Sequence, residues 1–240
     1  MSNLQVLLCD ADGNLFASEE PAFVASAEVT NQLLADLGVA RRFSPRELRL
    51  MAAGRNFRST ALELAANHGT SLDESELELY VEEERRSVTA QLGTSLTPEP
   101  DVLEPLTRLG RRFRLAAVSS SASARLDACF RAAGLAELFP PELRFSAEDS
   151  LAVPAGKPDP AIYLFAGREL GATGRQGLAI EDATAGVESA TAAGFPVIGN
   201  LAFVPADERR QRAADLRAAG AAAVVESWWE LEELLGGPGS

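Results

Sequence analysis

Two aspartates close the first apolar run of the chain, and their spacing points to phosphate chemistry. The run Val6–Cys9 is short, and Asp10, Asp12 and Gly13 follow it closely. This pattern predicts a buried strand that ends in two carboxylates and a tight turn. Neighbouring carboxylates repel each other, so the pair needs a cation, a shared proton or both. Because oxygen ligands with remaining waters suit Mg²⁺, we expect a magnesium-dependent phosphate site here.

Three later segments add polar groups to this set. The apolar stretch 115–118 is followed by Ser119, and the stretch 178–180 is followed by Glu181 and Asp182. Between them, Lys157 lies in a Gly-Lys-Pro-Asp-Pro segment. A point charge on a flexible stem suits a phosphoryl oxygen and can also offset neighbouring carboxylates.

The four segments, in this order, resemble the haloacid dehalogenase-like (HAD) hydrolase superfamily, close to its phosphoglucomutase-like phosphatase branch. The resemblance covers nearly the whole chain. It implies that Asp10 is the nucleophile, which attacks phosphorus and forms an aspartyl-phosphate. It also implies that Asp12 is the general acid for the leaving alcohol and then the general base for the attacking water.

The resemblance implies that Ser119 and Lys157 bind the oxygens of the transferred phosphoryl group. The strand register favours Ser119 for this role, although Ser120 or Ser121 could take it instead. Ser120 is also a candidate for contact with the substrate.

A Mg²⁺ ion is the cofactor that the resemblance implies. Its ligands would be Asp10, the backbone carbonyl of Asp12, and Asp182, with Glu181 in a direct or water-mediated role. The ion would neutralise charge that otherwise keeps an anionic nucleophile away from an anionic phosphate.

Three residues of the following region are further candidates for substrate contact. Arg55 or Arg58 could clamp a second anionic group of the substrate, and a solvated helix start is an equal alternative. Glu19 lies just past the nucleophile turn. It could touch the substrate, orient the region that follows, or act as a hinge.

The reaction type is narrowed by two residues. Haloacid dehalogenases lack the second aspartate because a halide leaves without a proton, whereas this chain has Asp12. Phosphonatases recruit a lysine from the cap, but Lys157 is the only lysine here, so phosphate ester chemistry is favoured. One departure from the family pattern is Asn14, where Thr or Val is usual, and we expect only a small effect on the turn.

The predicted function is therefore that of a Mg²⁺-dependent phosphatase for a small phosphorylated metabolite, a sugar phosphate or similar monoester. A phosphomutase of the β-phosphoglucomutase type is the alternative, because water or a sugar hydroxyl could capture the aspartyl-phosphate. An alternative of another class is a HAD-like regulatory or binding module with residual activity. Such modules often lose the nucleophile or the lysine, and this chain keeps Asp10 and Lys157.

The elements that position these residues follow an α/β pattern. From about Pro98, strands and helices alternate, which predicts a Rossmann-like parallel sheet. Residues 17–95 read as consecutive helices, and they resemble the inserted all-helical C1 cap of the family. We expect a catalytic core of residues 1–16 and 96–240, and a cap of residues 17–95. After the first strand, the expected strands are Leu115–Val118, Leu143–Phe145, Leu178–Ile180, Pro196–Ile198 and Ala222–Val225, and the expected core helices lie near 101–109, 123–133, 160–170, 185–193 and 206–219.

Local signals predict several helix ends. Ser44 with Glu47, and Ser227 with Glu230, have the spacing of a capping box. Gly93 is expected to end the long charged helix that precedes it.

Bulk composition limits the partners. The 240 residues carry a formal net charge of −13 with a pI of about 4.6. Such a surface repels nucleic acid and anionic membranes, so we expect neither as a partner. A small phosphorylated substrate would need local cations at the site. We expect a monomer, with a dimer as the alternative.

Single residues and missing signals narrow the class further. His68 is the only histidine, which argues against a Ser-His-Asp triad. Cys9 lies inside the first expected strand, so we expect a buried free thiol. The sequence shows no signal peptide or long apolar span, so a cytoplasmic location is expected.

Overall fold

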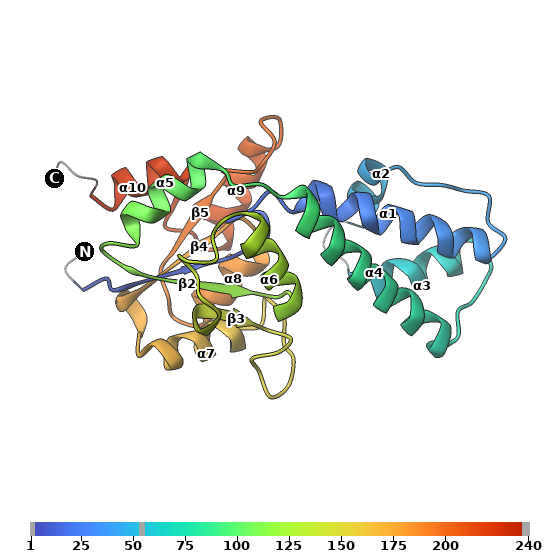
Figure 1. The fold of residues 1–240 in the computed structure, drawn as a ribbon, viewed down its shortest axis with the longest axis horizontal. Coiled ribbons are helices and arrows are strands. Elements are labelled where there is room, and N and C mark those ends of the chain that lie inside the picture. The colour runs from blue at the N-terminus through green and yellow to red at the C-terminus, as the bar shows by residue number, and fades with distance from the viewer. Residues whose placement is uncertain (1–2, 53–55, 237–240) are drawn as a thin grey trace. The chain divides into compact units, whose positions relative to one another are not determined.

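The chain folds into two compact units in the computed structural model, which describes residues 3–52 and 56–236. One unit consists of Met1–Ala17 and Leu96–Ser240, and the other consists of Ser18–Ser95. Figure 1 shows that strands and helices mix in the first unit, whereas the second is helical.

The α/β unit is built on a parallel sheet. Within the described residues the sheet has six strands in the order β3-β2-β1-β4-β5-β6. All neighbouring strands run parallel. The expected α/β architecture is thus confirmed, with strands β1 Val6–Cys9, β2 Arg114–Ser119, β3 Arg144–Ser146, β4 Gly177–Glu181, β5 Val197–Asn200 and β6 Ala223–Val225.

The strand order reverses beside β1. After β1 the chain builds β2 and β3 on one side, and then returns to build β4, β5 and β6 on the other. Open α/β sheets bind ligands at the carboxyl ends of the strands where the order reverses. The ends of β1, β2 and β4 are therefore where this sheet can form a site.

The first strand forms where the sequence predicted it because every residue in it is apolar and covered. All four side chains of Val6–Cys9 are buried. Leu7 pairs with Leu115 on one side and with Leu178 on the other. A parallel strand that is covered on both faces has this continuous apolar character instead of an alternating one.

Helices cover the sheet. Helices α7, α8 and α9 contribute Ile162, Val187 and Leu216 to the buried cluster that contains Leu8 of β1. Helices α5 and α10 lie side by side (Figure 1). The helices of this unit are α5 Pro100–Leu109, α6 Ser123–Ala132, α7 Ala161–Leu170, α8 Thr184–Ala192, α9 Arg209–Ala219 and α10 Trp228–Leu234, and short 3₁₀ turns lie at Pro141–Leu143 and Gly174–Gln176.

The helical unit has a small core of its own. Its helices are α1 Glu19–Asp36, α2 Pro45–Met51, α3 Phe57–Asn67 and α4 Glu74–Ser95. Apolar residues of α1, α3 and α4 form its buried cluster, which consists of Leu33, Leu34, Ala61, Leu64 and Leu77. The use of this unit as a cap stays a prediction.

Some local expectations were wrong. Gly93 does not end α4, which continues to Ser95. A glycine inside a helix costs about 1 kcal/mol relative to alanine, which packing along the rest of a long helix can offset. The helix expected near residue 206 begins at Arg209, and residues 206–208 form a turn that leads into it.

The two expected capping boxes differ in outcome. The box of Ser44 and Glu47 is complete. At the other, Ser227 Oγ accepts from the Glu230 amide at 3.1 Å, as expected. The Glu230 carboxylate, however, accepts from the amide of Glu226 at 2.7 Å, so this box is only half formed.

Two further observations concern Cys9 and the lengths of the helices. Cys9 is buried and forms no disulfide. No helix in residues 3–52 or 56–236 combines the length and the apolar character needed to cross a membrane.

Candidate active site

The nucleophile candidate Asp10 follows β1 at the carboxyl end of the sheet. Its amide donates to the carbonyl of Ile180 at 2.9 Å, which ties Asp10 to β4. The chain then turns through Gly13, whose φ of 76° is the left-handed conformation that glycine adopts without cost. A Cβ at Gly13 would lie 2.4 Å from Oδ2 of Asp182, so the missing side chain also makes room for that carboxylate.

Lys157 joins the ends of three strands. Its Nζ donates to Asp10 Oδ1 at 2.5 Å, to Glu181 Oε1 at 2.6 Å and to the carbonyl of Val118 at 2.8 Å. These acceptors stand at or beside the ends of β1, β4 and β2. Burial lowers the pKa of Lys157. The charges of Asp10 and Glu181 raise it by more than burial lowers it, so the pKa lies above its usual value. The ammonium therefore stays charged.

Three carboxylates gather at this point. Oxygens of Asp10, Glu181 and Asp182 lie within 4.8 Å of one another. Burial raises the pKa of Asp10 well above its ordinary value, with Glu181 and Asp182 adding to the rise and Lys157 opposing it. Burial also raises the pKa of Asp182 to about 7, helped by Glu181 and opposed by Arg212. Three carboxyl groups thus share one lysine, and full ionisation of all three would need further positive charge.

The residues present fit a divalent cation. The cluster offers only oxygen donors, which are the ligands that Mg²⁺ prefers. The space beside Asp182 exists because Gly13 lacks a side chain. A cation there would also relieve the repulsion that raises the pKa values of Asp10 and Asp182. The predicted ligands Asp10, Asp182 and Glu181 are thus brought together.

The Glu181 carboxylate is fixed by hydrogen bonds and by close packing. It is buried, and its Oε1 accepts from Lys157 and from the Tyr163 hydroxyl. Gly186 on α8 packs against it so closely that a Cβ there would lie 1.9 Å from Oε2. Tyr163 was not among the predicted site residues. An apolar helix gives no sign in the sequence that one hydroxyl on it reaches a buried carboxylate.

The serines at the end of β2 make different contacts. Ser119, the predicted phosphate ligand, is buried, and its Oγ accepts from the Ser121 amide at 3.0 Å. Ser120 Oγ accepts from the backbone amide of Lys157 at 3.1 Å, so it positions the lysine segment. Lys157 Nζ contacts the carbonyl of Val118, the residue before Ser119, but the choice of Ser119 as the phosphate ligand stays a prediction.

Asp12 has two partners that the sequence did not reveal. Arg125 Nη2 donates to Asp12 Oδ1 at 2.8 Å, and Ser121 Oγ donates to Asp12 Oδ2 at 2.7 Å. Arg125 lies in the first turn of α6, which begins shortly after β2. A signal was available, because the first turn of a helix that follows a site strand lies at the same edge of the sheet.

A second arginine reaches the cluster from α9. Arg212 Nη1 donates to the backbone carbonyl of Asp182 at 2.9 Å. This bond fixes the peptide that follows β4, and the charge opposes the rise in the pKa of Asp182. Arg212 is 30 residues from Asp182, so no local sequence pattern predicted this contact.

Asn14 has a different role from the one expected. It is fully buried, and its backbone is not left-handed. Its Nδ2 donates to the carbonyl of Asp10 at 3.0 Å and to that of Ile180 at 3.1 Å. The expectation of a small, local effect on the turn does not describe these bonds, because one of them reaches β4.

The three candidates from the helical region are described only within their own unit. Glu19 begins α1 and pairs with Arg49 at 3.6 Å. Arg58 lies on α3, where it pairs with Glu74 at 2.9 Å and with a second glutamate of α4. Arg55 lies outside the described residues. Contact of these side chains with a substrate stays a prediction.

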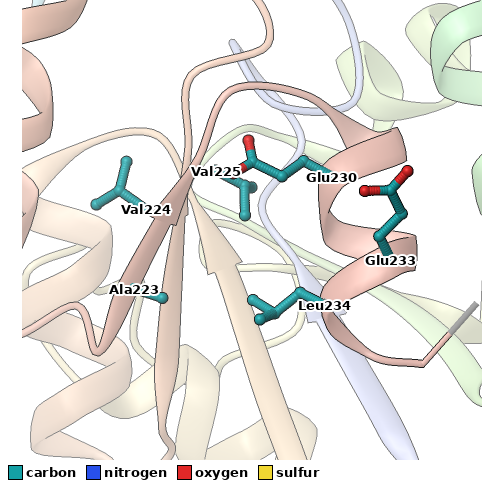
Figure 2. A pocket seen from close by; sticks show the side chains of 6 residues that line it. All are labelled: Ala223, Val224, Val225, Glu230, Glu233 and Leu234. Carbon is teal, nitrogen blue, oxygen red and sulfur yellow. The ribbon is translucent and has the colours of Figure 1, made fainter. Parts of the chain in front are cut away.

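A separate hollow lies between β6 and α10 (Figure 2). It has a volume of about 390 Å³ and is lined by Ala223, Val224, Val225, Glu230, Glu233 and Leu234. Its charged groups are carboxylates, which repel phosphate. The hollow therefore offers no phosphate site in competition with the cluster at Asp10.

Comparison with solved structures finds relatives over nearly the whole length. A haloacid dehalogenase-like protein of unknown function from Agrobacterium tumefaciens is 26% identical, with a TM-score of 0.73 and 97% of each chain covered. A HAD family hydrolase from Deinococcus radiodurans, with bound phosphate and sodium, is 26% identical, with a TM-score of 0.70 and coverage of 98% of this chain and 96% of that chain. A protein provisionally assigned as a β-phosphoglucomutase, from Bacteroides vulgatus, is 25% identical, with a TM-score of 0.66 and coverage of 97% and 88%.

Two further comparisons bear on identity. The comparison with curated proteins found no match. Residues 4–194 match the family model of the haloacid dehalogenase-like hydrolases, and these residues make up more than half of the chain. The sheet order, the acidic cluster and the buried lysine agree with that match. The chain belongs to the haloacid dehalogenase-like hydrolase family.

Proposed function

We propose that this protein is a Mg²⁺-dependent phosphatase that hydrolyses a small phosphate monoester, such as a sugar phosphate. The observation that carries the proposal is the position of Lys157, whose Nζ contacts both Asp10 Oδ1 and Glu181 Oε1. A nucleophile, a phosphate-binding cation and a carboxylate cluster that suits a metal thus meet at one edge of the sheet. Asp12 lies on the same turn as Asp10 and supplies the acid and base.

The proposed reaction has two displacements at phosphorus. In the first, the Asp10 carboxylate forms a bond to phosphorus while the ester P–O bond breaks, and the leaving oxygen takes a proton from Asp12. In the second, water attacks phosphorus, its proton passes to Asp12, and the bond to Asp10 breaks. One ester and one water thus give one alcohol and one inorganic phosphate, and the enzyme is regenerated.

Asp12 must change partners during this cycle. Arg125 and Ser121 donate to its two oxygens, an arrangement that suits an ionised carboxylate. The ionised form is the one needed to accept a proton from water. In the first displacement Asp12 has to carry a proton, and a neutral carboxyl binds arginine more weakly. We therefore expect the contact with Arg125 to open when a substrate is bound.

The other residues hold and orient the phosphoryl group. Lys157 and Ser119 would donate to its oxygens. Asp10, Asp182 and the backbone carbonyl of Asp12 would hold Mg²⁺, with Glu181 beside them. The ion supplies charge compensation and orientation when it is bound.

The comparisons support phosphate chemistry and leave a second candidate. The Deinococcus relative was solved with bound phosphate. The Bacteroides relative, provisionally a β-phosphoglucomutase, favours phosphoryl transfer between sugar hydroxyls as the alternative. Both reactions share the aspartyl-phosphate, and they differ in what captures it.

The test is release of inorganic phosphate from a panel of phosphate monoesters. Release should require Mg²⁺, stop with EDTA, and fall below detection in Asp10→Asn. Asp215→Asn, which neutralises a half-buried aspartate of α9 that lies outside the acidic cluster, is the matched control and should keep the wild-type rate. Phosphate release by Asp10→Asn at the wild-type rate would overturn the proposal. Conversion of a sugar phosphate into its isomer, with no phosphate released, would select the phosphomutase.

A further inference from the structure

Asn14 joins the two strands that carry the carboxylates of the site. Its Nδ2 donates to the carbonyl of Asp10 at 3.0 Å and to the carbonyl of Ile180 at 3.1 Å. The amide of Asp10 donates to the same Ile180 carbonyl at 2.9 Å. One side chain therefore ties the peptide that follows Asp10 to the peptide that precedes Glu181.

The amide group of Asn14 is held in one orientation. Its Oδ1 accepts from Asn200 Nδ2 at 2.8 Å, so the other end of the amide must be the donor. The amide of Ala202 donates to Asn200 Oδ1 at 3.1 Å, which orients Asn200 in turn. Trp228 Nε1 donates to the carbonyl of Asn14 at 3.0 Å. Asn14 and Trp228 are fully buried and Asn200 is 1% exposed, so water does not compete for these bonds.

These bonds connect the backbone segments that carry Asp10, Glu181 and Asp182, so they affect the distances between the three carboxylates. Asp10 stands at one of the joined peptides, and Glu181 and Asp182 follow the other. The three carboxylates have their oxygens within 4.8 Å of one another, although their charges repel. Lys157 offsets part of that repulsion by contacting Asp10 and Glu181, and the bridge between the two strand ends holds the backbone against the rest.

We propose that Asn14 is a positioning residue that sets the separation of Asp10 from Glu181 and Asp182, and through it the affinity of the site for a divalent cation. The inference rests on the proposed use of Mg²⁺. Asn14 itself touches neither the substrate nor the ion in this proposal. It acts through the two carbonyls that it holds.

A purely structural role would have a different signature. Loss of a buried hydrogen bond anywhere in this network should lower the unfolding midpoint. Only a positioning role predicts that the folded protein also binds Mg²⁺ more weakly. The affinity for Mg²⁺ without substrate, measured at a temperature where every variant is folded, separates the two.

The experiment compares two variants of similar shape. Asn14→Val removes both donors, and Asn14→Thr keeps one hydroxyl donor. Isothermal titration with MgCl₂, without substrate, should show an affinity about tenfold or more weaker for Asn14→Val, which is the range for residues that orient metal ligands. Asn14→Thr should recover part of that loss. If Asn14→Val does not fold, Asn14→Thr takes its place against the wild type.

Trp228→Phe is the control within the same network. It removes the donor to the Asn14 carbonyl and leaves the bridge between Asp10 and Ile180 in place. It should lower the unfolding midpoint and keep the Mg²⁺ affinity within about twofold of the wild type, because the orientation of the ligands is unchanged. Wild-type Mg²⁺ affinity in the Asn14 variants, or an equal loss in Trp228→Phe, would overturn the positioning role alone. No Mg²⁺ binding by the wild type would overturn it together with the proposed metal dependence.

Discussion

Charged side chains are used in opposite ways in the two units. In the α/β unit, Lys157 lies between Asp10 and Glu181, and the three side chains are 6%, 11% and 1% exposed. At this depth water screens little, so the removal of one charge leaves the others without compensation. Burying these charges costs folding free energy, which indicates that the arrangement serves a purpose other than stability.

In the helical unit the ion pairs lie at the surface. Arg58 contacts Glu74 and Glu78, and the three side chains are 35%, 79% and 56% exposed. Exposed pairs of this kind contribute little to stability because water and salt screen them. In these two clusters, the buried charges lie at the candidate site and the exposed charges lie on a solvated helix surface.

The largest effect is expected for Lys157→Met. It leaves two carboxylates buried without their cation, which should cost on the order of 3–5 kcal/mol of unfolding free energy in EDTA. It also removes the contact to the phosphoryl group, so phosphate release should fall below detection. Urea unfolding and the release assay measure the two effects.

Arg58→Met is the matched control for this prediction. Like Lys157→Met, it replaces a basic side chain with methionine, but at a position on the surface. It should leave the unfolding curve close to that of the wild type. If Arg58→Met destabilises the protein as much as Lys157→Met, the comparison between the units is wrong.

The dependence of stability on pH should have opposite signs in the two units. Burial raises the pKa of Asp182 to about 7, so the folded protein holds this proton more tightly than the unfolded chain does. Its stabilising contribution is present below pH 3.8, the ordinary value, and is lost as the pH rises toward 7. In EDTA, Asp182→Asn should therefore become more stable relative to the wild type over this interval. Thermal unfolding from pH 4 to pH 8 measures the difference, and added Mg²⁺ should stabilise the wild type more than the variant.

Asp36 on α1 provides the opposite case. Hydrogen bonds from Tyr80 and Gln32 lower its pKa below the ordinary value of 3.8. Its contribution is present above that value and is lost as the pH falls through the lowered pKa. Asp36→Asn should thus cost stability at pH 7 and lose that cost in acid. The same sign for both variants would contradict the comparison.

The smallest effects are expected where the two units are alike. Ser44 and Ser227 each accept a hydrogen bond from the backbone amide three residues on. Ser44→Ala and Ser227→Ala should each cost about 1 kcal/mol, the usual value for an N-cap. Urea unfolding checks both. A difference of several kcal/mol between them would show that the units differ in more than the burial of charge.

The parts of the fold that were predicted are those with a local cause. The run Val6–Cys9 is apolar throughout and ends at an aspartate, so its bounds were clear from the sequence. Lys157 and Asp182 both lie close to Asp10, as the family resemblance led us to expect, and their roles stay predictions. The length of α4 was misjudged at Gly93, where tertiary packing outweighs the preference of a single residue.

The parts that were not predicted depend on neighbours distant in the sequence. Asn14 meets Asn200 only because β5 lies next to β4, and 186 residues separate the two. Arg125 reaches Asp12 across a separation of 113 residues. Asn14 departs from the family pattern and Arg125 begins a helix after a site strand, but the partner of each side chain is set by the sheet order, which the sequence alone does not show.

The most direct test of the central claim is the detection of phosphate on Asp10 itself. The experiment uses Asp12→Asn with Mg²⁺ and 4-nitrophenyl phosphate. The nitrophenolate of this substrate leaves without a proton, so the first displacement can occur, but the variant lacks the base for the second displacement. After an acid quench, mass spectrometry should find the phosphoryl group on the peptide that contains Asp10. Steady release of nitrophenolate with no phosphorylated enzyme, or a phosphoryl group on another residue such as Ser119, would contradict the account.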